Sequence, residues 1–290
     1  MAKQFVYDED GEEISAWAES TDEAVEAAKE ELDEAGVDLD DEEIRERIRV
    51  IPSPTRIKSS PEDVLMDKRR RGGIEAAEVV ESGMDVGLGT GSTTAWAIAA
   101  IGWKLESGEL ENIRGVATSL QSHDLARELD IPLTDVDEFE SLDVAIDGAD
   151  QWDPENPHVV KGGGASHARE KLIDEMADRL VVATDDEKQS TPLSHPVPLS
   201  VLPESRNVAQ SWVKEQGGDP QLRYAEKKDG PLFTANGNLV VDCDFGEIDD
   251  IEGHAADLAR IPGAQEHGLF VDMVDDVVYG TDDGVETVSF

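Results

Sequence analysis

Five side chains in this sequence have the chemistry that proton transfer and the binding of a negatively charged oxygen require. Asp147 and Asp150 stand three apart across a glycine, and two carboxylates so placed can move protons on a hydroxyl or bind a metal. Lys161 precedes three glycines and can stabilise a developing oxyanion, while Glu170 can act as a carboxylate base. Lys188 closes a strand-like segment and adds a second positive charge. Each also has an ordinary structural explanation, because aspartates commonly cap turns and most lysines lie in solvent.

A glycine-rich segment, GLGTGST at residues 87–93, lies between a strand-like run and an apolar helix-like run. Glycines let a backbone approach an anion, and the amides and hydroxyls at a helix start donate hydrogen bonds to it. The spacing differs from the dinucleotide pattern G-x-G-x-x-G, and the P-loop lysine is missing. With Asp85 the segment is similar to the first motif of S-adenosylmethionine-dependent methyltransferases, but the next strand ends at Thr118-Ser119 instead of an acid for the ribose hydroxyls. A glycine turn that only lets helix and sheet pack is the remaining alternative.

The elements that would hold these motifs alternate between strands and helices from residue 60 onward. Strands are expected at 84–86, 115–118, 142–146 and 180–183, and helices at 60–83, 94–101, 122–129 and 166–179. This alternation predicts an α/β fold, a doubly wound, mainly parallel sheet. Ligands of such sheets bind beyond the carboxyl ends of the strands, which is where all of the polar motifs fall.

Two smaller units accompany this predicted sheet. Residues 198–270 indicate a small α+β domain, with helices at 208–216 and 254–261 and a strand at 239–241, and residues 277–288 are expected to return as strands. Residues 1–57 indicate an acidic α+β appendage of unknown role, with two strands around Asp10-Gly11, a helix capped by Thr21 and a linker at 51–55. The catalytic α/β domain is then expected to comprise 58–197 and 271–290.

Composition restricts the partners. The 290 residues include 67 Asp and Glu against 25 Lys and Arg, a formal net charge of −42. Nucleic acids and anionic membranes attract clustered Lys and Arg, so neither is an expected partner. Cys243 is the only cysteine, which excludes an intrachain disulfide and favours a reducing compartment. No apolar stretch approaches the roughly 20 residues of a spanning helix and no signal peptide is visible, so we expect a cytoplasmic protein.

Taken in order, the motifs resemble those of ribose-5-phosphate isomerase type A over roughly residues 66–288. The resemblance rests on GLGTGST, Thr118-Ser119, DGAD at 147–150, KGGG at 161–164 with REK at 169–171, Lys188, TANGN at 234–238, and IPGA and GLF between 261 and 270. It implies interconversion of ribose 5-phosphate and ribulose 5-phosphate through a cis-enediolate, with no metal or organic cofactor. A small-molecule sugar phosphate is the implied partner, and a homodimer or homotetramer the implied assembly.

The resemblance also implies roles for individual residues. Glu170 would shuttle the proton between C1 and C2, and Lys161 would stabilise the enediolate oxygen. Asp147 would assist ring opening, and Asp150 would line the sugar. The residues that would hold the sugar hydroxyls and the phosphate are Thr90, Gly91, Ser92, Thr93, Gly148, Ala149, Gly162, Gly163, Gly164 and Lys188.

The sequence departs from the family's usual pattern at several points. Gln151 stands where the family usually has Glu, and Ala235 where it usually has Asp. An ungapped count places Arg69, beside Lys68, where relatives have a phosphate-binding lysine, and the basic run at 68–71 is expected to add to a local positive pocket. The first 57 residues have no usual counterpart, so we expect either a genuine appendage or a misassigned start codon, with Met66 near where relatives begin.

Three other functions compete with this interpretation. A coenzyme A transferase of the same superfamily would use Glu170 as a nucleophile, although the surrounding motifs fit the isomerase better. A non-catalytic sugar-phosphate sensor would be expected to carry a basic helix-turn-helix, whereas the N-terminal unit is acidic. A metal enzyme is disfavoured because none of the six histidines pair at H-x-x-x-H spacing.

The acidic residues are spread along the whole chain, with 19 acids against 7 bases in residues 1–60 and 48 against 18 in the rest. Such an even acidic surface is a halophile's means of staying soluble, because self-repulsion is screened when the Debye length falls to about 3 Å in molar salt. We therefore expect the unfolding temperature to rise between low and molar KCl. Thermal melts followed by circular dichroism test this, and equal midpoints at both concentrations would contradict it.

Overall fold

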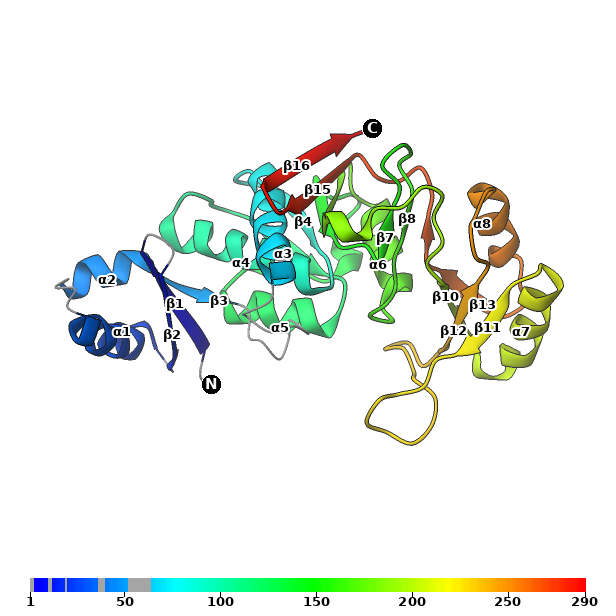
Figure 1. Ribbon diagram of the computed structural model, residues 1–290, viewed down its shortest axis with the longest axis horizontal. Helices are drawn as coiled ribbons and strands as arrows, with labels where there is room; N and C mark the ends of the chain where they lie inside the picture. The colour runs from blue at the N-terminus through cyan, green and yellow to red at the C-terminus, as the bar shows by residue number, and fades with distance from the viewer. Residues whose placement is uncertain (1–2, 10–11, 19, 36–39, 52–63) are drawn as a thin grey trace.

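The computed structural model describes residues 3–9, 12–18, 20–35, 40–51 and 64–290. The molecule is elongated, with a small N-terminal unit at one end, a large α/β unit in the middle and a third unit at the other end (Figure 1). The helix start expected at Ser60-Pro61 and most of the linker expected at 51–55 lie outside the described residues. Within those residues, no helix combines the length and the apolar character needed to cross a bilayer.

A six-stranded sheet forms the centre of the molecule. Its order is β16-β15-β9-β6-β4-β5, and its strands are β4 (Asp85–Leu88), β5 (Arg114–Ala117), β6 (Val144–Asp147), β9 (Leu180–Asp185), β15 (Asp276–Thr281) and β16 (Gly284–Ser289). Strands β15, β9, β6, β4 and β5 run parallel to one another, and β16 pairs antiparallel with β15. The predicted mainly parallel α/β fold is confirmed, and the strand ends that carry the polar motifs meet at one edge.

Four helices pack on this sheet and three short 3-10 turns connect its elements, while a fourth 3-10 turn, η4, follows β10 (Val197–Val201) in the third unit. They are α3 (Val64–Ala76), α4 (Ser92–Ser107), α5 (Leu120–Glu128) and α6 (His167–Glu175), with η1 (Ala77–Val79), η2 (Val136–Glu138), η3 (Asp186–Lys188) and η4 (Pro203–Ser205). Residues 93–102 of α4 are all buried, as a helix that is apolar on every side requires. α4 follows Gly91, whose φ of 131° is a conformation that glycine adopts without steric cost. The glycine loop therefore delivers the chain from β4 into a buried helix whose first turn faces the sheet edge.

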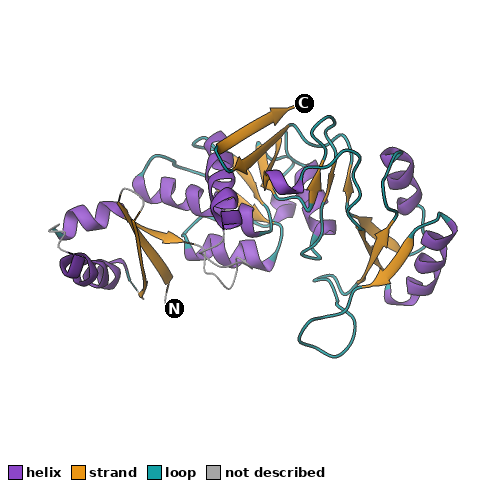
Figure 2. Cartoon of the chain, in the orientation of Figure 1, coloured by secondary structure: helices purple, strands orange, loops and turns teal. Residues whose placement is uncertain are grey.

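A four-stranded antiparallel sheet forms the third unit, with order β11-β12-β10-β13. Its elements are β10 (Val197–Val201), α7 (Arg206–Glu215), β11 (Asp219–Leu222), β12 (Leu239–Asp244), α8 (Ile251–Ala259) and β13 (Ala264–His267). A long loop between β11 and β12 projects from this sheet (Figure 2).

A separate three-stranded sheet, β14-β8-β7, is formed by β7 (Gln151–Trp152), β8 (Val159–Val160) and β14 (Leu269–Phe270), so the chain leaving the third unit pairs with strands next to the central sheet. The exact domain division stays a prediction.

The N-terminal unit is a three-stranded antiparallel sheet with two helices. Its strands have the order β2-β1-β3, with β1 (Lys3–Glu9), β2 (Glu12–Ala18), α1 (Thr21–Ala35), α2 (Asp41–Arg47) and β3 (Ile48–Ile51). The two expected strands are present, but the strand β3 was not expected. The expected cap is wrong by one residue: the amide of Glu23 donates to the Ser20 hydroxyl at 3.2 Å, so Ser20 accepts at the helix start where Thr21 was predicted to.

Helix α3 packs so closely against the sheet and against α4 that its contact points, Gly72 and Gly73, have no space for a side chain. A Cβ added to Gly72 would lie 2.7 Å from the Thr184 carbonyl oxygen, and one added to Gly73 would lie 2.7 Å from the Trp96 Cβ and collide with the Thr93 carbonyl oxygen. This close approach holds α3 beside the carboxyl end of β9, and Arg69, one turn before Gly72, lies at the edge where the polar motifs meet.

Replacing Gly73 by Ala should therefore destabilise the protein by about 1 to 3 kcal/mol through overpacking. The sign is opposite to the stabilisation of about 1 kcal/mol that Gly to Ala gives inside an unhindered helix. Urea unfolding in molar KCl measures the difference. Glu75→Ala, at an exposed position of the same helix, is the matched control and should change stability by no more than about 0.5 kcal/mol. A more stable Gly73→Ala protein would show that α3 is free to move away from α4.

Candidate active site

A cavity of about 320 Å³ opens at the carboxyl edge of the central sheet, between the glycine loop, α6 and η3. Its lining consists of Arg69, Thr90, Gly91, Ser92, Thr93, Thr94, Gln121, Gly148, Ala149, Asp150, Lys161, Gly162, Gly163, Gly164, Glu170 and Lys188. All site residues predicted from the sequence line this cavity except Asp147, which lies beneath it. Gln121 and Thr94 were not predicted, because neither belongs to a motif that the sequence singles out.

A buried ion cluster underlies the cavity. The Lys161 ammonium lies 2.6 Å from a carboxylate oxygen of Asp147, 2.7 Å from one of Asp174 and 4.0 Å from one of Glu170. The Lys161 side chain is only 1% exposed, and it also lies 4.7 Å from the ring centroid of the buried Phe270. A cation so far from water requires this set of partners to stay charged.

Asp174 is the member of the cluster that belongs to none of the motifs identified in the sequence. It stands four residues after Glu170 on α6, and helix residues at that spacing share one face. Its spacing from the predicted base was the available signal, but the sequence does not show which face of α6 meets the lysine. The Asp174 side chain is fully buried and its contact with Lys161 makes it a structural partner of the proposed catalytic pair.

The charges of the cluster do not cancel. Burial alone would lower the pKa of Lys161, but the carboxylates of Asp147, Asp174 and Glu170 raise it above its ordinary value, so the ammonium stays charged. Burial, followed by the Asp147 charge, raises the pKa of Glu170 well above its ordinary range. Burial also raises the pKa of Asp174 to about 7, against the pull of Lys161. Because one lysine faces three carboxyl groups, the carboxyl groups of the cluster hold protons more tightly than isolated carboxyl groups do.

Asp147 holds the glycine loop in place from below. One of its carboxylate oxygens accepts the amides of Thr90 at 2.9 Å and Gly148 at 2.7 Å, while the other faces Lys161. A side chain on Gly89 would collide with this carboxylate, which explains a glycine there. The residue is 1% exposed, so in this structure it contacts the loop and the lysine rather than the cavity.

The segment of three glycines forms the wall facing Asp150. The Asp150 carboxylate accepts the amide of Gly163 at 2.6 Å, and a Cβ on that glycine would lie 2.6 Å from the same carboxylate. Gly162 has φ +106°, and a Cβ there would lie 2.8 Å from the His167 ring. Both positions thus require glycine, one for its backbone conformation and both for close approach.

Two cations face the other end of the cavity. Arg69 donates from Nε to Asp185 at 3.2 Å and from Nη1 to the Ser92 hydroxyl at 3.4 Å. Lys188 donates to the carbonyl oxygen of Ala149 at 2.6 Å, and burial lowers the pKa of its ammonium. Near them the helix α4 begins, with backbone amides that favour an anion. This end of the cavity has the groups that a phosphate requires.

Arg69 is the member of the basic run at 68–71 that lines the cavity. Lys68 is 5% exposed and its ammonium instead lies 3.0 Å from Asp186 and 2.9 Å from Asp282. Arg71 donates to the carbonyl oxygen of Thr281 at 2.9 Å. The guanidinium of Arg70 lies over the ring of Trp96, 5.4 Å from its centroid. The expectation that the whole run adds to a positive pocket is therefore wrong, because Lys68, Arg70 and Arg71 contact other groups and do not line the cavity.

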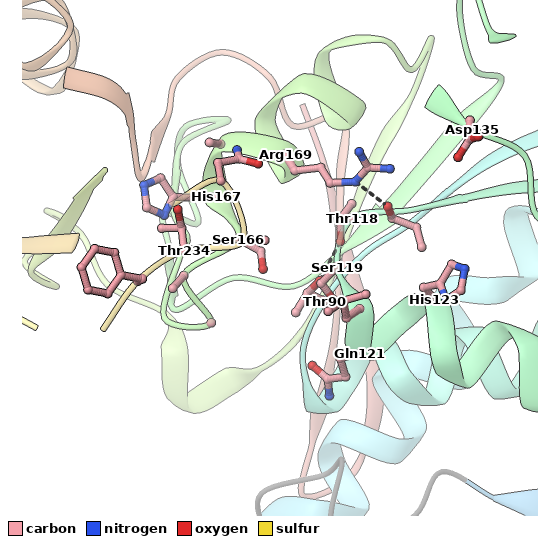
Figure 3. Close-up of a pocket in the computed structure, with 18 of the residues that line it drawn as sticks. Thr90, Thr118, Ser119, Gln121, His123, Asp135, Ser166, His167, Arg169 and Thr234 are labelled. Carbon is pink, nitrogen blue, oxygen red and sulfur yellow. Dashed lines mark hydrogen bonds between the residues drawn. The ribbon is translucent and has the colours of Figure 1, made fainter. Parts of the chain in front are cut away.

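A second, larger hollow of about 890 Å³ adjoins the first and shares Thr90, Gln121 and Gly164 with it. Figure 3 shows residues of the β5–α5 and α6 segments around it, with Arg169 donating to the Ala117 carbonyl oxygen at 2.9 Å. The far wall is the loop between β11 and β12, including Ala235. The larger hollow thus lies between the central and third units, next to the smaller cavity.

The departure at Gln151 has a local explanation. Its side-chain oxygen accepts the amides of Ser194 at 2.6 Å and His195 at 2.7 Å, and its amide nitrogen donates to the Ser194 hydroxyl at 3.4 Å. Gln151 therefore holds a turn before β10 and does not line the cavity. Among the residues that the structure describes, no three His, Cys, Asp or Glu side chains form a cluster able to hold a metal ion.

A family model and curated relatives indicate the same family. The family described as ribose 5-phosphate isomerase A (phosphoriboisomerase A) matches residues 114–284. A ribose-5-phosphate isomerase A of Natronomonas pharaonis is 54% identical over 219 residues, covering 76% of this chain and 95% of its own length. The corresponding protein of Haloarcula marismortui is 53% identical over 217 residues, covering 75% and 93%.

Two solved structures of this family are similar to the chain over most of its length. A D-ribose-5-phosphate isomerase in complex with phospho-erythronic acid is 38% identical with a TM-score of 0.76, covering 78% of this chain and 99% of that one. Ribose 5-phosphate isomerase A of Methanocaldococcus jannaschii is 36% identical with a TM-score of 0.74, covering 80% and 100%.

Replacing Lys161 by Met should lower the free energy of unfolding by about 3 to 5 kcal/mol near neutral pH, because the buried carboxylates lose their cation. The deficit should grow as the pH rises. Without the lysine the pKa values of Glu170 and Asp174 rise further in the folded protein, so folding binds protons and stability falls with increasing pH. Urea unfolding at pH 5 and pH 8 in molar KCl measures both effects.

Two further variants control this experiment. Adding Asp174→Asn to Lys161→Met removes one of the unpaired charges and should recover part of the loss at pH 8. Lys104→Met removes a lysine whose ammonium lies 2.8 Å from the largely exposed Glu78, and it should cost at most about 1 kcal/mol. A Lys161→Met protein no less stable than Lys104→Met would refute the proposed importance of the cluster.

Proposed function

The chain belongs to the ribose 5-phosphate isomerase A family, and we propose that its reaction, the interconversion of D-ribose 5-phosphate and D-ribulose 5-phosphate, takes place in the cavity at the carboxyl edge of the central sheet. The observation that carries this placement is the pair formed by Glu170 and Lys161. A carboxylate and an ammonium 4.0 Å apart line one small cavity, with cations for a phosphate at its other end. An aldose-ketose isomerase needs these groups together: a base, a partner for an oxyanion and an anchor.

The proton moves between two neighbouring carbons. In the open-chain aldose, the Glu170 carboxylate takes the proton from C2, the electron pair of that bond forms the C1–C2 double bond, and O1 takes up the negative charge. Glu170 then returns the proton to C1 while the proton of the C2 hydroxyl passes to O1, so that C2 becomes the ketone carbonyl and O1 becomes a hydroxyl. A base with a pKa raised toward the working pH is better matched to this task than an ordinary glutamate.

Lys161 stabilises the enediolate through its fixed positive charge. Because its carboxylate neighbours raise its pKa, the ammonium does not give up its proton, and it acts as an electrostatic partner. Its position is set before substrate binds, since Asp147 and Asp174 hold it at 2.6 and 2.7 Å. No reorganisation of the lysine is then required when charge develops on the substrate oxygen.

The remaining cavity residues bind the rest of the substrate. We assign the phosphate to Arg69, Lys188, Ser92, Thr93 and the amides at the start of α4, and the sugar hydroxyls to the loops at 148–150 and 162–164. Asp150 faces the cavity and is the carboxylate available for ring opening. Asp147, assigned that role by resemblance, acts in this proposal through the glycine loop and Lys161.

Identity to proteins of Natronomonas and Haloarcula, together with the net charge of −42, supports a halophilic enzyme. A cytoplasmic location and a homodimer or homotetramer are part of the proposal, as is the division into an appendage at 1–57, a catalytic domain and a small domain at 198–270. The transferase and sensor alternatives are not favoured, since the family match extends over most of the α/β unit.

Replacing Glu170 by Gln should reduce kcat for ribose 5-phosphate by about 10² to 10⁴-fold, the usual contribution of a positioned base, while KM changes little because the phosphate-binding groups remain. The assay measures ribulose 5-phosphate formation in molar KCl after EDTA treatment. Glu175→Gln, exposed at the end of the same helix, is the matched control and should keep wild-type turnover. Full activity of Glu170→Gln would reject the mechanism, and an inactive wild type would reject the function.

A further inference from the structure

Arg223, in the third unit, reaches the catalytic glycine segment from outside the central sheet. It follows β11, and its backbone is fixed by hydrogen bonds on both sides: its amide donates to the Val240 carbonyl and its carbonyl accepts the amide of Leu232, each at 2.9 Å. Its guanidinium forms a two-pronged pair with Asp242 of β12, with Nε at 2.8 Å from one oxygen and Nη2 bonded to the other. The side chain is therefore held before it contacts anything else.

The remaining arm of the guanidinium binds two consecutive peptide carbonyls. Nη1 donates to the carbonyl oxygen of Gly162 at 3.0 Å and to that of Gly163 at 3.0 Å. In a planar trans peptide the N–H points opposite to the C=O. The carbonyl of Gly162 shares its peptide with the amide of Gly163, which faces Asp150 at 2.6 Å. By the same geometry, the amide of Gly164 points away from Arg223, and Gly164 lines the cavity.

We propose that Arg223 is a positioning residue that fixes two peptide planes of the glycine segment and thereby the directions of their amides. One amide orients Asp150, and the other is presented to an oxygen of the sugar. This inference rests on the isomerase function proposed above and extends it to a residue outside the cavity. It also assigns the third unit a part in catalysis, because both Arg223 and its partner Asp242 belong to that unit.

The glycine segment needs this support because its own sequence provides little. Three consecutive glycines have more backbone freedom than any other tripeptide, and no side chain of theirs can hold them. Donors that stabilise a developing oxyanion act strongly only when they are already oriented. The positive charge of Arg223 also reaches this segment: together with burial, the largest cause, it lowers the pKa of His167, which packs against Gly162, to about 4.

Arginine is better suited to this position than lysine. Its planar fork can grip a carboxylate with two nitrogens and still direct a third at other acceptors, whereas an ammonium is a point charge. Arg223→Lys would keep the charge and lose the simultaneous contacts. A comparison of the Lys and Ala variants thus separates the effect of charge from that of orientation.

The test uses full-length Arg223→Lys and Arg223→Ala, with Arg260→Ala as the control. Arg260 lies in the same unit with its side chain 78% exposed. We expect kcat for ribose 5-phosphate to fall about 10-fold in the Lys variant and about 100-fold in the Ala variant, the loss typical of displaced reacting groups. KM should stay near the wild-type value, since Arg69 and Lys188 are untouched. Methylguanidinium should restore part of the turnover of Arg223→Ala, and methylammonium at equal ionic strength should not.

Amide hydrogen exchange provides a measurement that is independent of turnover. Exchange at 162–164 should accelerate in Arg223→Ala and stay unchanged in Arg260→Ala. Wild-type kcat and wild-type exchange in Arg223→Ala would overturn the inference. So would a loss of activity that guanidinium does not restore and that accompanies a rise in KM and a fall in Tm, because this pattern indicates general destabilisation. An inactive wild type would refute the proposed function, and the exchange data alone would then decide whether Arg223 orders the segment.

Discussion

The ion cluster around Lys161 is the constraint on which the site depends. An ammonium with 1% exposure is tolerated only if its partners are close and correctly placed, and removing one partner from such a pair costs more than the intact pair contributes. Its partners come from different elements: Asp147 from the end of β6, and Glu170 and Asp174 from α6. The lysine itself follows β8. The cluster therefore requires the sheet, the helix and the segment after β8 to be correctly placed relative to one another before any substrate binds.

This requirement extends from the side chains to the backbone. Asp147 uses one oxygen for Lys161 and the other for the amides of Thr90 and Gly148, so one carboxylate joins the cluster to the loops that follow β4 and β6. On the other side, Arg223 holds the carbonyls of the segment that follows Lys161. The glycine-rich segments, which have no large side chains of their own, are thereby held by the charged groups of Asp147 and Arg223 on the side away from the cavity. The cavity can expose bare amides to a ligand because the residues that orient them stand outside it.

The sequence was sufficient to predict the sheet edge and most of the cavity, for a physical reason. Parallel strands bring their carboxyl ends together, so motifs that follow successive strands converge without knowledge of the tertiary structure. The features that the sequence did not reveal depend on the direction of a side chain from its helix or on contacts between residues far apart in the chain. Asp174 required knowledge of which face of α6 is buried, Lys68 and Arg69 differ only in the side of α3 they occupy, and Arg223 lies 61 positions from Gly162 in the chain. Strand β3 was missed because its four residues follow a helix directly.

The acidic surface and the cationic site are compatible because they act over different distances. The net charge of −42 produces a repulsion toward a phosphate ester that reaches well beyond contact in dilute solution, and molar salt confines it to about 3 Å. The contacts of Arg69 and Lys188 operate within that length and in a partly buried site, where salt screens them least. The same argument applies to the ion cluster, whose side chains are at most 5% exposed. High salt therefore removes the long-range penalty of the surface while leaving the short-range charges of the cavity in force, and the chain can carry an excess of carboxylates around the cavity to which we assign the phosphate.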